Sequence, residues 1–115
     1  MSLYSYQFGR EAPIAAQLDG TSPIELASGG NNGATVLALR LAEVAGATPT
    51  VTLDIYDGVV VVAEIAHLKA FTAKEMWEAI RLDGVPVHLL PGQTLRATAS
   101  AANQVHVTGV VIEVI

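Results

Sequence analysis

The residues best suited to chemistry are three histidines, His67, His88 and His106, which lie far apart in the sequence. None of them has a partner at the short spacing of metal-binding motifs such as H-x-H or H-E-x-x-H. Solvent-facing or hydrogen-bonded strand positions would explain all three without a metal ion. We therefore predict no metal site, and the absence of cysteine excludes thiolate ligands and disulfides.

The acidic residues offer two close pairs, Asp54 with Asp57 and Glu75 with Glu78. A glycosidase needs two carboxylates on either side of a cleft wide enough for a sugar, and a small domain rich in Ala and Val has little material for one. A turn explains Asp57, which precedes glycine. Solvent-facing strand positions or a helical surface explain the other three carboxylates.

The serine and glycine motifs are also incomplete. No serine lies in a G-x-S-x-G sequence. The segment "SGGNNG" (28–33) lacks the trailing lysine of a P-loop and the strand and helix that would flank one. We interpret it as a flexible linker. The sequence thus predicts no catalytic residues and no cofactor, and we expect that the protein is not an enzyme.

The composition predicts a single globular domain. The chain has 115 residues, of which 51% are hydrophobic and 15% charged. Its net charge is −5 and its six Lys and Arg residues are scattered, so we expect no nucleic-acid partner. No apolar run reaches the ~20 residues that cross a bilayer, and no secretory signal begins the chain. We expect a soluble protein that is made in a cytoplasm and has no membrane partner.

Alternating hydrophobicity predicts short strands over most of the chain. In the first of these runs, Leu37, Leu39 and Leu41 share one side. Asp57-Gly58 is a strong hairpin signal between two of the runs. Six or seven short strands without alternating helices indicate an antiparallel β-sandwich, for which a jelly roll is one fitting topology. The clearest runs cover residues 35–44, 50–56, 59–68, 94–100 and 105–115.

One segment, "FTAKEMWEAIRLDG" (71–84), fits both a helix and a strand. As a helix it would begin at Thr72, with Glu75 completing a capping box and Trp77 on the apolar side. As a strand it would place Met76 and Ile80 on one face. The strand is slightly favoured because short strands dominate on both sides, and "VPVHLLPG" after it is interpreted as an edge strand or loop.

The first 34 residues lack sustained periodicity, and we predict that they form an N-terminal arm and linker, with the sandwich in residues 35–115. Tyr4, Tyr6 and Phe8 have the same parity, so an extended segment would direct all three rings to one side. They could pack into the sandwich as a first strand. They could equally anchor the arm on a neighbouring molecule, because buried aromatic side chains dominate the energetics of interfaces.

The last predicted strand carries apolar side chains on both of its faces. Val105, Val107, Val111 and Ile115 share one face, and the other face is polar at first and then apolar. A second strand or a second subunit should cover its apolar end. The predicted interface residues there are Val110, Ile112 and Val114.

The C-terminal half resembles small β-sandwich virion proteins of tailed bacteriophages. The resemblance covers residues 35–115 and rests on the "DG" hairpin, the segment "DGVPVHLLPGQTLRATAS" with its L-x-P-G-x-x-L-R core, and the closing "ANQVHVTGVVIEV". It implies a structural component of the particle on the capsid surface, made in the cytoplasm of a host bacterium. The best-fitting role is a capsid decoration or cement protein that binds the major capsid protein and associates with itself, commonly as a trimer.

Two alternatives stay open at this stage. A head–tail joining, tail or fibre-associated protein belongs to the same structural class. A carbohydrate-binding module for host recognition belongs to a different class, and it would use the single tryptophan, Trp77, as a platform for a sugar ring.

Overall fold

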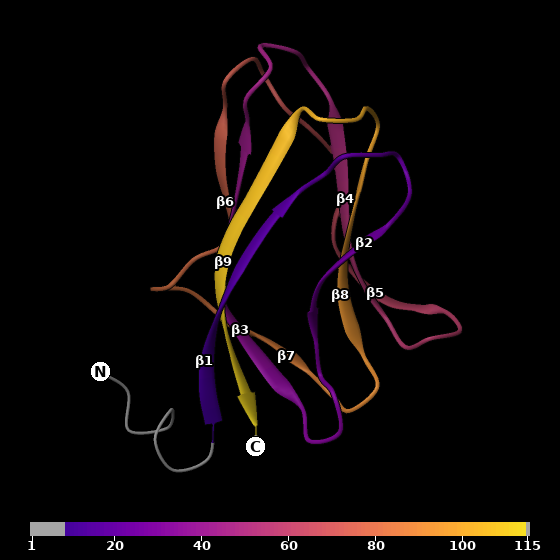
Figure 1. Cartoon of the computed structure of the whole chain (residues 1–115), viewed down its shortest axis with the longest axis vertical. Coiled ribbons are helices and arrows are strands. Elements are labelled where there is room, and N and C mark those ends of the chain that lie inside the picture. Colours follow the sequence, from indigo (N-terminus) through magenta and orange to yellow (C-terminus); the bar gives the residue numbers. More distant parts are fainter. Residues whose placement is uncertain (1–8, 115) are drawn as a thin grey trace.

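The computed structural model describes residues 9–114, which form two antiparallel sheets packed against each other (Figure 1). All regular elements in this range are strands, so the prediction of an all-β antiparallel sandwich is confirmed. The strands are β1 (Gly9–Gln17), β2 (Ile24–Ser28), β3 (Ala34–Glu43), β4 (Thr50–Tyr56), β5 (Val61–Ala70), β6 (Met76–Ile80), β7 (Val87–Leu89), β8 (Thr94–Ala99) and β9 (Val105–Val114).

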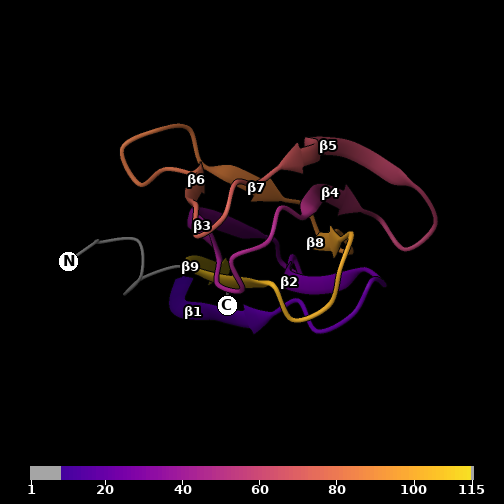
Figure 2. The same ribbon diagram turned by 90° about the horizontal axis from the view of Figure 1, so that it is seen from above.

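The strand order is that of a jelly roll. Sheet A has the order β1-β9-β3-β6, with β7 also paired to β3, and sheet B has the order β2-β8-β4-β5. β1 pairs with β9 in sheet A, and β2 pairs with β8 in sheet B. Successive pairs of early and late strands thus alternate between the sheets, as in the double Greek key of jelly rolls. Seen from above, the two sheets form two adjacent layers (Figure 2).

The core lies between the sheets and is built of aliphatic side chains. Leu39, Leu41, Leu53 and Leu95 are fully buried, and Phe71 is the one aromatic ring among the fully buried side chains of the described residues. Most strands alternate buried and more exposed positions because successive side chains point to opposite faces, whereas β5 has no buried residue. Every buried side-chain nitrogen or oxygen within residues 9–114 has a hydrogen-bond partner.

The predicted boundary at residue 34 does not separate an arm from the sandwich in the described part of the chain. Residues 9–17 form β1, which pairs with β9 along its whole length, and residues 24–28 form β2 beside β8. Ile14 and Leu18 are core residues. Pro13 fits in β1 because this strand is at the edge of its sheet. Tyr4, Tyr6 and Phe8 lie outside the described residues.

The segment 28–33 is a fixed turn, which corrects its interpretation as a flexible linker. Gly33 donates its N–H to the carbonyl of Gly29 at 2.7 Å, and Gly29 donates to the carbonyl of Gln93 at 2.7 Å. Gly92 in turn donates to the carbonyl of Gly30 at 3.0 Å. Two connections between the sheets, 29–33 and 90–93, therefore close this end of the sandwich together.

The ambiguous segment forms a strand, β6, as slightly favoured from its sequence. The expected capping contact between Thr72 and Glu75 exists, but it stabilises a turn before β6 and not the start of a helix. The Thr72 N–H donates to the Glu75 carboxylate at 2.9 Å, and the Glu75 N–H donates to the carbonyl of Thr72 at 3.1 Å. A register shift in the pairing of β3 with β6 puts Ile80 in the core and leaves Met76 exposed. These two side chains therefore do not share a face.

Candidate assembly surfaces

The outer face of sheet A carries the predicted interface residues. On β9, Val111 points into the core, while Val110 and Ile112 are half-buried and Val114 is 44% exposed. Val110 lies opposite Pro13 of β1 in the antiparallel pairing. No described element covers this face, so the structure groups the three residues on an apolar area where a single jelly roll would meet water.

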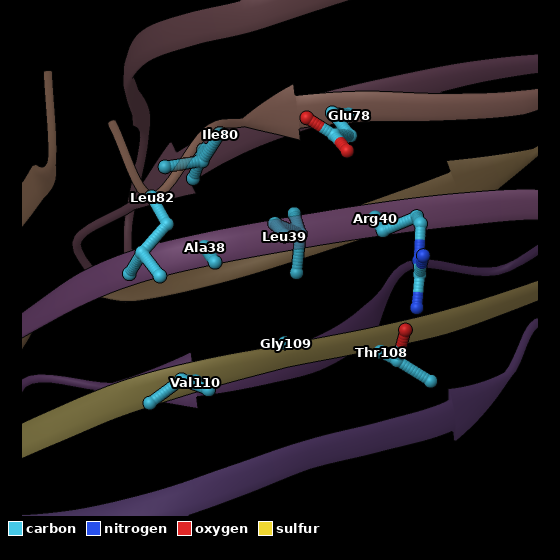
Figure 3. A pocket seen from close by; sticks show the side chains of 9 residues that line it. All are labelled: Ala38, Leu39, Arg40, Glu78, Ile80, Leu82, Thr108, Gly109 and Val110. Atoms are coloured by element: carbon cyan, nitrogen blue, oxygen red, sulfur yellow. The ribbon is translucent and has the colours of Figure 1, made fainter. Parts of the chain in front are cut away.

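A hollow of about 320 Å³ lies beside this area, where the edge of β3 is left unpaired (Figure 3). β6 pairs with β3 as far as Leu39, and β7 resumes pairing at Val36. A bulge in the pairing of β3 with β9 makes Leu37 the extra residue. The bulge also explains why Leu37 is only half-buried, although it was predicted to share a face with Leu39 and Leu41.

The hollow has an apolar end and a polar end (Figure 3). Ile80, Leu82 and Val110 line the apolar end, and Leu82 is 75% exposed. Arg40 and Glu78 lie at the polar end. Glu78 forms an ion pair with Arg81 at 3.8 Å, whereas Arg40 makes no ion pair or side-chain hydrogen bond with any other residue in 9–114.

Gly109 forms part of the floor of the hollow and must be glycine. A Cβ atom at this position would lie 2.3 Å from the carbonyl oxygen of Ala38, which no real Cβ contact allows. The bulge in β3 brings this carbonyl close to β9. The role of Gly109 was not predicted from the sequence, although a glycine inside a strand pattern is a known sign of a bulge or a close backbone approach.

A second apolar surface lies at the tip of the β4–β5 hairpin, residues 57–62. Val59 is 80% exposed and Val60 is 54% exposed, and the two valines that follow are also exposed. The first half of β5 is uncovered on both faces, because the hairpin extends beyond the sandwich (Figures 1 and 2). Sequence reasoning placed these valines in a returning strand without recognising that they are exposed.

Asp57 shapes this tip. Its Oδ1 accepts the N–H groups of Val59 and Val60 at 2.9 and 2.8 Å, and Gly58 adopts a φ of 97°. The turn therefore spans four residues rather than the two expected from Asp57-Gly58. The N–H groups of Val60 and Val59 hold the pKa of the Asp57 carboxyl below its usual value, against a smaller opposing effect of burial, so this group is charged at neutral pH.

The outer face of sheet B is polar and internally paired. Arg96 of β8 binds both carboxylate oxygens of Asp54 on β4, at 2.9 and 3.3 Å, and its guanidinium lies 3.9 Å from the centroid of the Tyr56 ring. Asp54 is almost fully buried by these neighbours although it points away from the core. Arg96 thus neutralises the outward-facing carboxylate of Asp54 within the chain. Neither charge of this ion pair is available to bind a ligand.

The carboxylate of Glu43 holds together the opposite end of the sandwich from the 29–33 turn. It accepts N–H groups from Ala45, Gly46, Ala47 and Lys74 at 2.8–3.1 Å. Burial of the carboxyl raises its pKa, but the four donors together outweigh burial, so the net pKa is lowered. This buried acid is structural, and its role was not predicted from the sequence.

The three histidines do not lie close together in the structure. His67 pairs with Glu64 at 2.9 Å, His88 contacts the Thr35 hydroxyl at 2.9 Å, and His106 is exposed on β9. Within residues 9–114 no group of three or more His, Cys, Asp or Glu side chains could hold a metal ion. A helix long and apolar enough to span a membrane is likewise not found in this range.

Trp77 is half-buried and its ring is occupied by contacts within the chain. The ring packs edge-on against Phe71, with centroids 6.0 Å apart, and the Lys69 ammonium lies 5.4 Å from the Trp77 centroid. Lys69 also pairs with Glu75 at 3.0 Å. The tryptophan therefore forms part of a packed cluster at the side of sheet A, which differs from an open platform for a sugar.

Comparison with known proteins gives little further information. No family model matches the chain, and no curated protein sequence matches it. A similar solved structure is described as a pentameric capsid protein isolated from metagenomic phage sequences, with 16% identity and a TM-score of 0.42. The match covers 98% of this chain and 63% of that chain, so this chain spans less than two thirds of the other protein.

Proposed function

We propose that this chain is a non-enzymatic structural protein of a tailed-bacteriophage virion, and specifically a capsid decoration protein. The observation that carries the proposal is the apolar area on the outer face of sheet A, formed by Val110, Ile112 and Val114, which no element within residues 9–114 covers. An apolar area on a complete sandwich marks a surface meant for other molecules. The phage setting is supported by the sequence resemblance over residues 35–115.

The stabilising effect of such a protein follows from mass action. A ligand that binds only the assembled shell stabilises that shell by RT ln(1 + [L]/Kd). Self-association, with a trimer as the favoured state, would present several copies of the binding surface at once and would bury the apolar area under closed symmetry. The aromatic residues Tyr4, Tyr6 and Phe8 are the proposed anchors on the major capsid protein.

The polar residues support a structural role over an enzymatic one. The most deeply buried acids, Glu43 and Asp54, are satisfied by backbone donors and by Arg96. Glu75 is held by Thr72 and Lys69. These carboxylates stabilise turns and strand pairs, and no described cavity brings them together.

The carbohydrate-binding alternative loses its main sequence argument, because the ring of Trp77 packs against Phe71 and Lys69. A head–tail joining or tail-associated role remains the second candidate, since the same apolar area would serve it. The two structural roles differ in where the chain lies in the particle.

The test is co-sedimentation of the purified protein with expanded, empty capsids of the phage that encodes it. We expect saturable binding to the lattice and a higher melting temperature of the decorated shell. Ile112→Asp, and replacement of Tyr4, Tyr6 and Phe8 by serine, should each weaken binding by about tenfold or more. Thr98→Asp, which changes a half-buried outward position of sheet B, serves as the matched control and should bind normally.

Two results would contradict the proposal. Retention on host polysaccharide, lost in Trp77→Ala, would support the carbohydrate-binding module. Localisation at the unique vertex or on the tail in intact particles, without binding to the lattice, would support the joining role.

A further inference from the structure

Two apolar features lie on opposite sides of the molecule. The tip of the β4–β5 hairpin, residues 57–62, extends from sheet B, whereas the hollow lies on the outer face of sheet A beside the β6–β7 connection. The hairpin and that connection project in opposite directions in both views (Figures 1 and 2). Neither feature is covered by another described element, and one chain cannot bring its own two features together.

We propose that the hairpin tip of one copy seats in the hollow of a second copy, so that subunits associate head to tail. The inference deepens the self-association that forms part of the proposed function, and it names the two surfaces that meet. It does not require that the assembly bind a capsid.

The apolar parts of the two surfaces match. The tip presents Val59 and Val60, the former 80% exposed, at the end of a narrow projection. The hollow presents Leu82, 75% exposed, with the half-buried Val110 and the edge of the core at Ile80 beside it. Its open side and its volume of about 320 Å³ suit the end of a hairpin (Figure 3). Contact would remove several large aliphatic side chains from water, which is the main driving force of association.

The charged parts match in one pair, Asp57 with Arg40, because Glu78 at the same end of the hollow has its own partner, Arg81, at 3.8 Å. Oδ1 of Asp57 is occupied by two backbone N–H groups, whereas Oδ2 accepts no hydrogen bond from any residue in 9–114. Arg40, at the polar end of the hollow, makes no ion pair within the same range. A tip whose valines occupy the apolar end would bring the Asp57 carboxylate toward the Arg40 guanidinium. This pair would fix the orientation of the tip more than it would add to affinity.

The alternative use of β5, pairing edge to edge with a second β5, fits the structure less well. The pairing of β4 with β5 contains three register shifts, and Leu68 adopts a φ of 49° while its N–H donates to Thr52. Such irregularities twist an edge strand and discourage pairing with another chain. A head-to-tail contact joins two different surfaces, so it generates a closed ring or an open chain of subunits.

The test is sedimentation velocity on the purified full chain over a wide range of concentration. We expect that the wild type self-associates, and that Val59→Glu at the tip and Leu82→Glu in the hollow each weaken association by about 30-fold or more. Arg40→Gln should weaken it by about tenfold. Leu68→Glu on β5 and Val85→Glu in the β6–β7 connection are matched controls, since both residues are exposed and lie outside the two surfaces.

Mixing the two variants separates a head-to-tail contact from a symmetric one. Val59→Glu keeps an intact hollow and Leu82→Glu keeps an intact tip, so an equimolar mixture should form heterodimers with wild-type affinity and nothing larger. The melting temperature and circular dichroism of each variant establish that it is folded. If Val59→Glu is unfolded, Val60→Glu replaces it in the same design.

Three outcomes would overturn the inference: a wild type that is monomeric at all concentrations, single variants that associate normally, or monomeric variants that do not combine in the mixture. Association that instead depends on Tyr4, Tyr6 and Phe8, tested with their serine variant, would assign the hollow or another surface to the N-terminal residues and would also overturn it. Failure of the proposed function has a different signature, because the wild type would then associate in this manner without binding capsids.

Discussion

Glu43 shows how one buried carboxylate can organise several backbone segments. It gathers N–H groups from residues 45–47 and from Lys74, which lie in two different connections at one end of the sandwich. Replacing the acid leaves several buried donors without a full acceptor, and unmade hydrogen bonds of buried groups are costly. We expect Glu43→Gln to fold with a melting temperature lower by about 5–10 °C, measured by calorimetry at pH 7. Glu25→Gln, at an exposed position of sheet B, is the control and should melt like the wild type.

The same residue predicts how stability depends on pH. The pKa of Glu43 is lowered in the folded protein, as are those of Asp57 and Glu75. A carboxyl group whose pKa is lower in the folded protein than in the unfolded chain stabilises the fold at pH values above its unfolded pKa. This stabilisation is lost as the pH falls through the pKa of the folded state. The melting temperature should therefore be constant near neutral pH and should decrease below about pH 4.5, the ordinary value for Glu. Glu43→Gln should show a shallower decrease, and an equally steep one would show that Glu43 does not contribute.

Gly109 supports a second prediction for a single residue. Alanine at this position would force its Cβ against the carbonyl of Ala38, and only movement of β3 or β9 could relieve the contact. We expect Gly109→Ala to lower the free energy of unfolding by about 3 kcal/mol in urea titrations. Gly20→Ala is the matched control, because a Cβ there meets no atom within 4 Å, and it should change stability by less than about 0.5 kcal/mol.

At the scale of the elements, the pair Asp54–Arg96 joins β4 to β8 on the outer face of sheet B. Both side chains are largely buried, and the guanidinium hydrogen bonds to the carboxylate raise the pKa of Arg96, against a smaller opposing effect of burial. Removing one partner leaves the other charge without compensation, so we expect Asp54→Asn and Arg96→Met each to cost about 2–4 kcal/mol. In a double-mutant cycle the combined variant should lose less than the sum of the two, by about 1–2 kcal/mol. Additive losses would mean that the two side chains act independently.

The elements that the sequence predicts well are those with uninterrupted alternation. β4, β8 and β9 lie where the period of two placed them, because both their core residues and their turns follow local rules. β1 was missed because Pro13 interrupts its pattern, and proline is tolerated there only since β1 is an edge strand. Edge position is a property of the whole sheet, so it could not be inferred from residues 9–17 alone.

The candidate surfaces were predictable only in part. The apolar outer side of β9 follows from the alternation of residues along the strand, and its residues were predicted from the sequence. The hollow depends on a bulge at Leu37, whose local sign is the glycine at position 109 of the neighbouring strand, and on the gap between β6 and β7, which leaves no clear local pattern. The exposure of Val59 and Val60 depends on how far the β4–β5 hairpin extends beyond the part of sheet B that sheet A covers. The sequence predicted a returning strand for this run of valines and gave no sign of that exposure.

At the scale of the whole molecule, the jelly roll closes its core with residues from both ends of the described chain. Several apolar side chains that the core does not include are exposed on its surface. β1 pairs with β9, and β2 pairs with β8, so the first and last parts of residues 9–114 stabilise each other. The exposed valines of the tip and the hollow on sheet A are two departures from a surface suited to a monomer. Association should therefore change the stability of the fold itself.

This coupling gives a prediction for the intact protein. When folded subunits bind one another and unfolded chains do not, the melting temperature rises with protein concentration. We expect a rise of about 5–10 °C for the wild type when its concentration increases a hundredfold from near the dissociation constant. Val59→Glu should melt at one temperature throughout the range, because its tip no longer enters the hollow, whereas Leu68→Glu should behave like the wild type. Equal slopes for Val59→Glu and the wild type, followed by differential scanning fluorimetry of the Trp77 emission, would show that the subunits associate through a surface other than the tip.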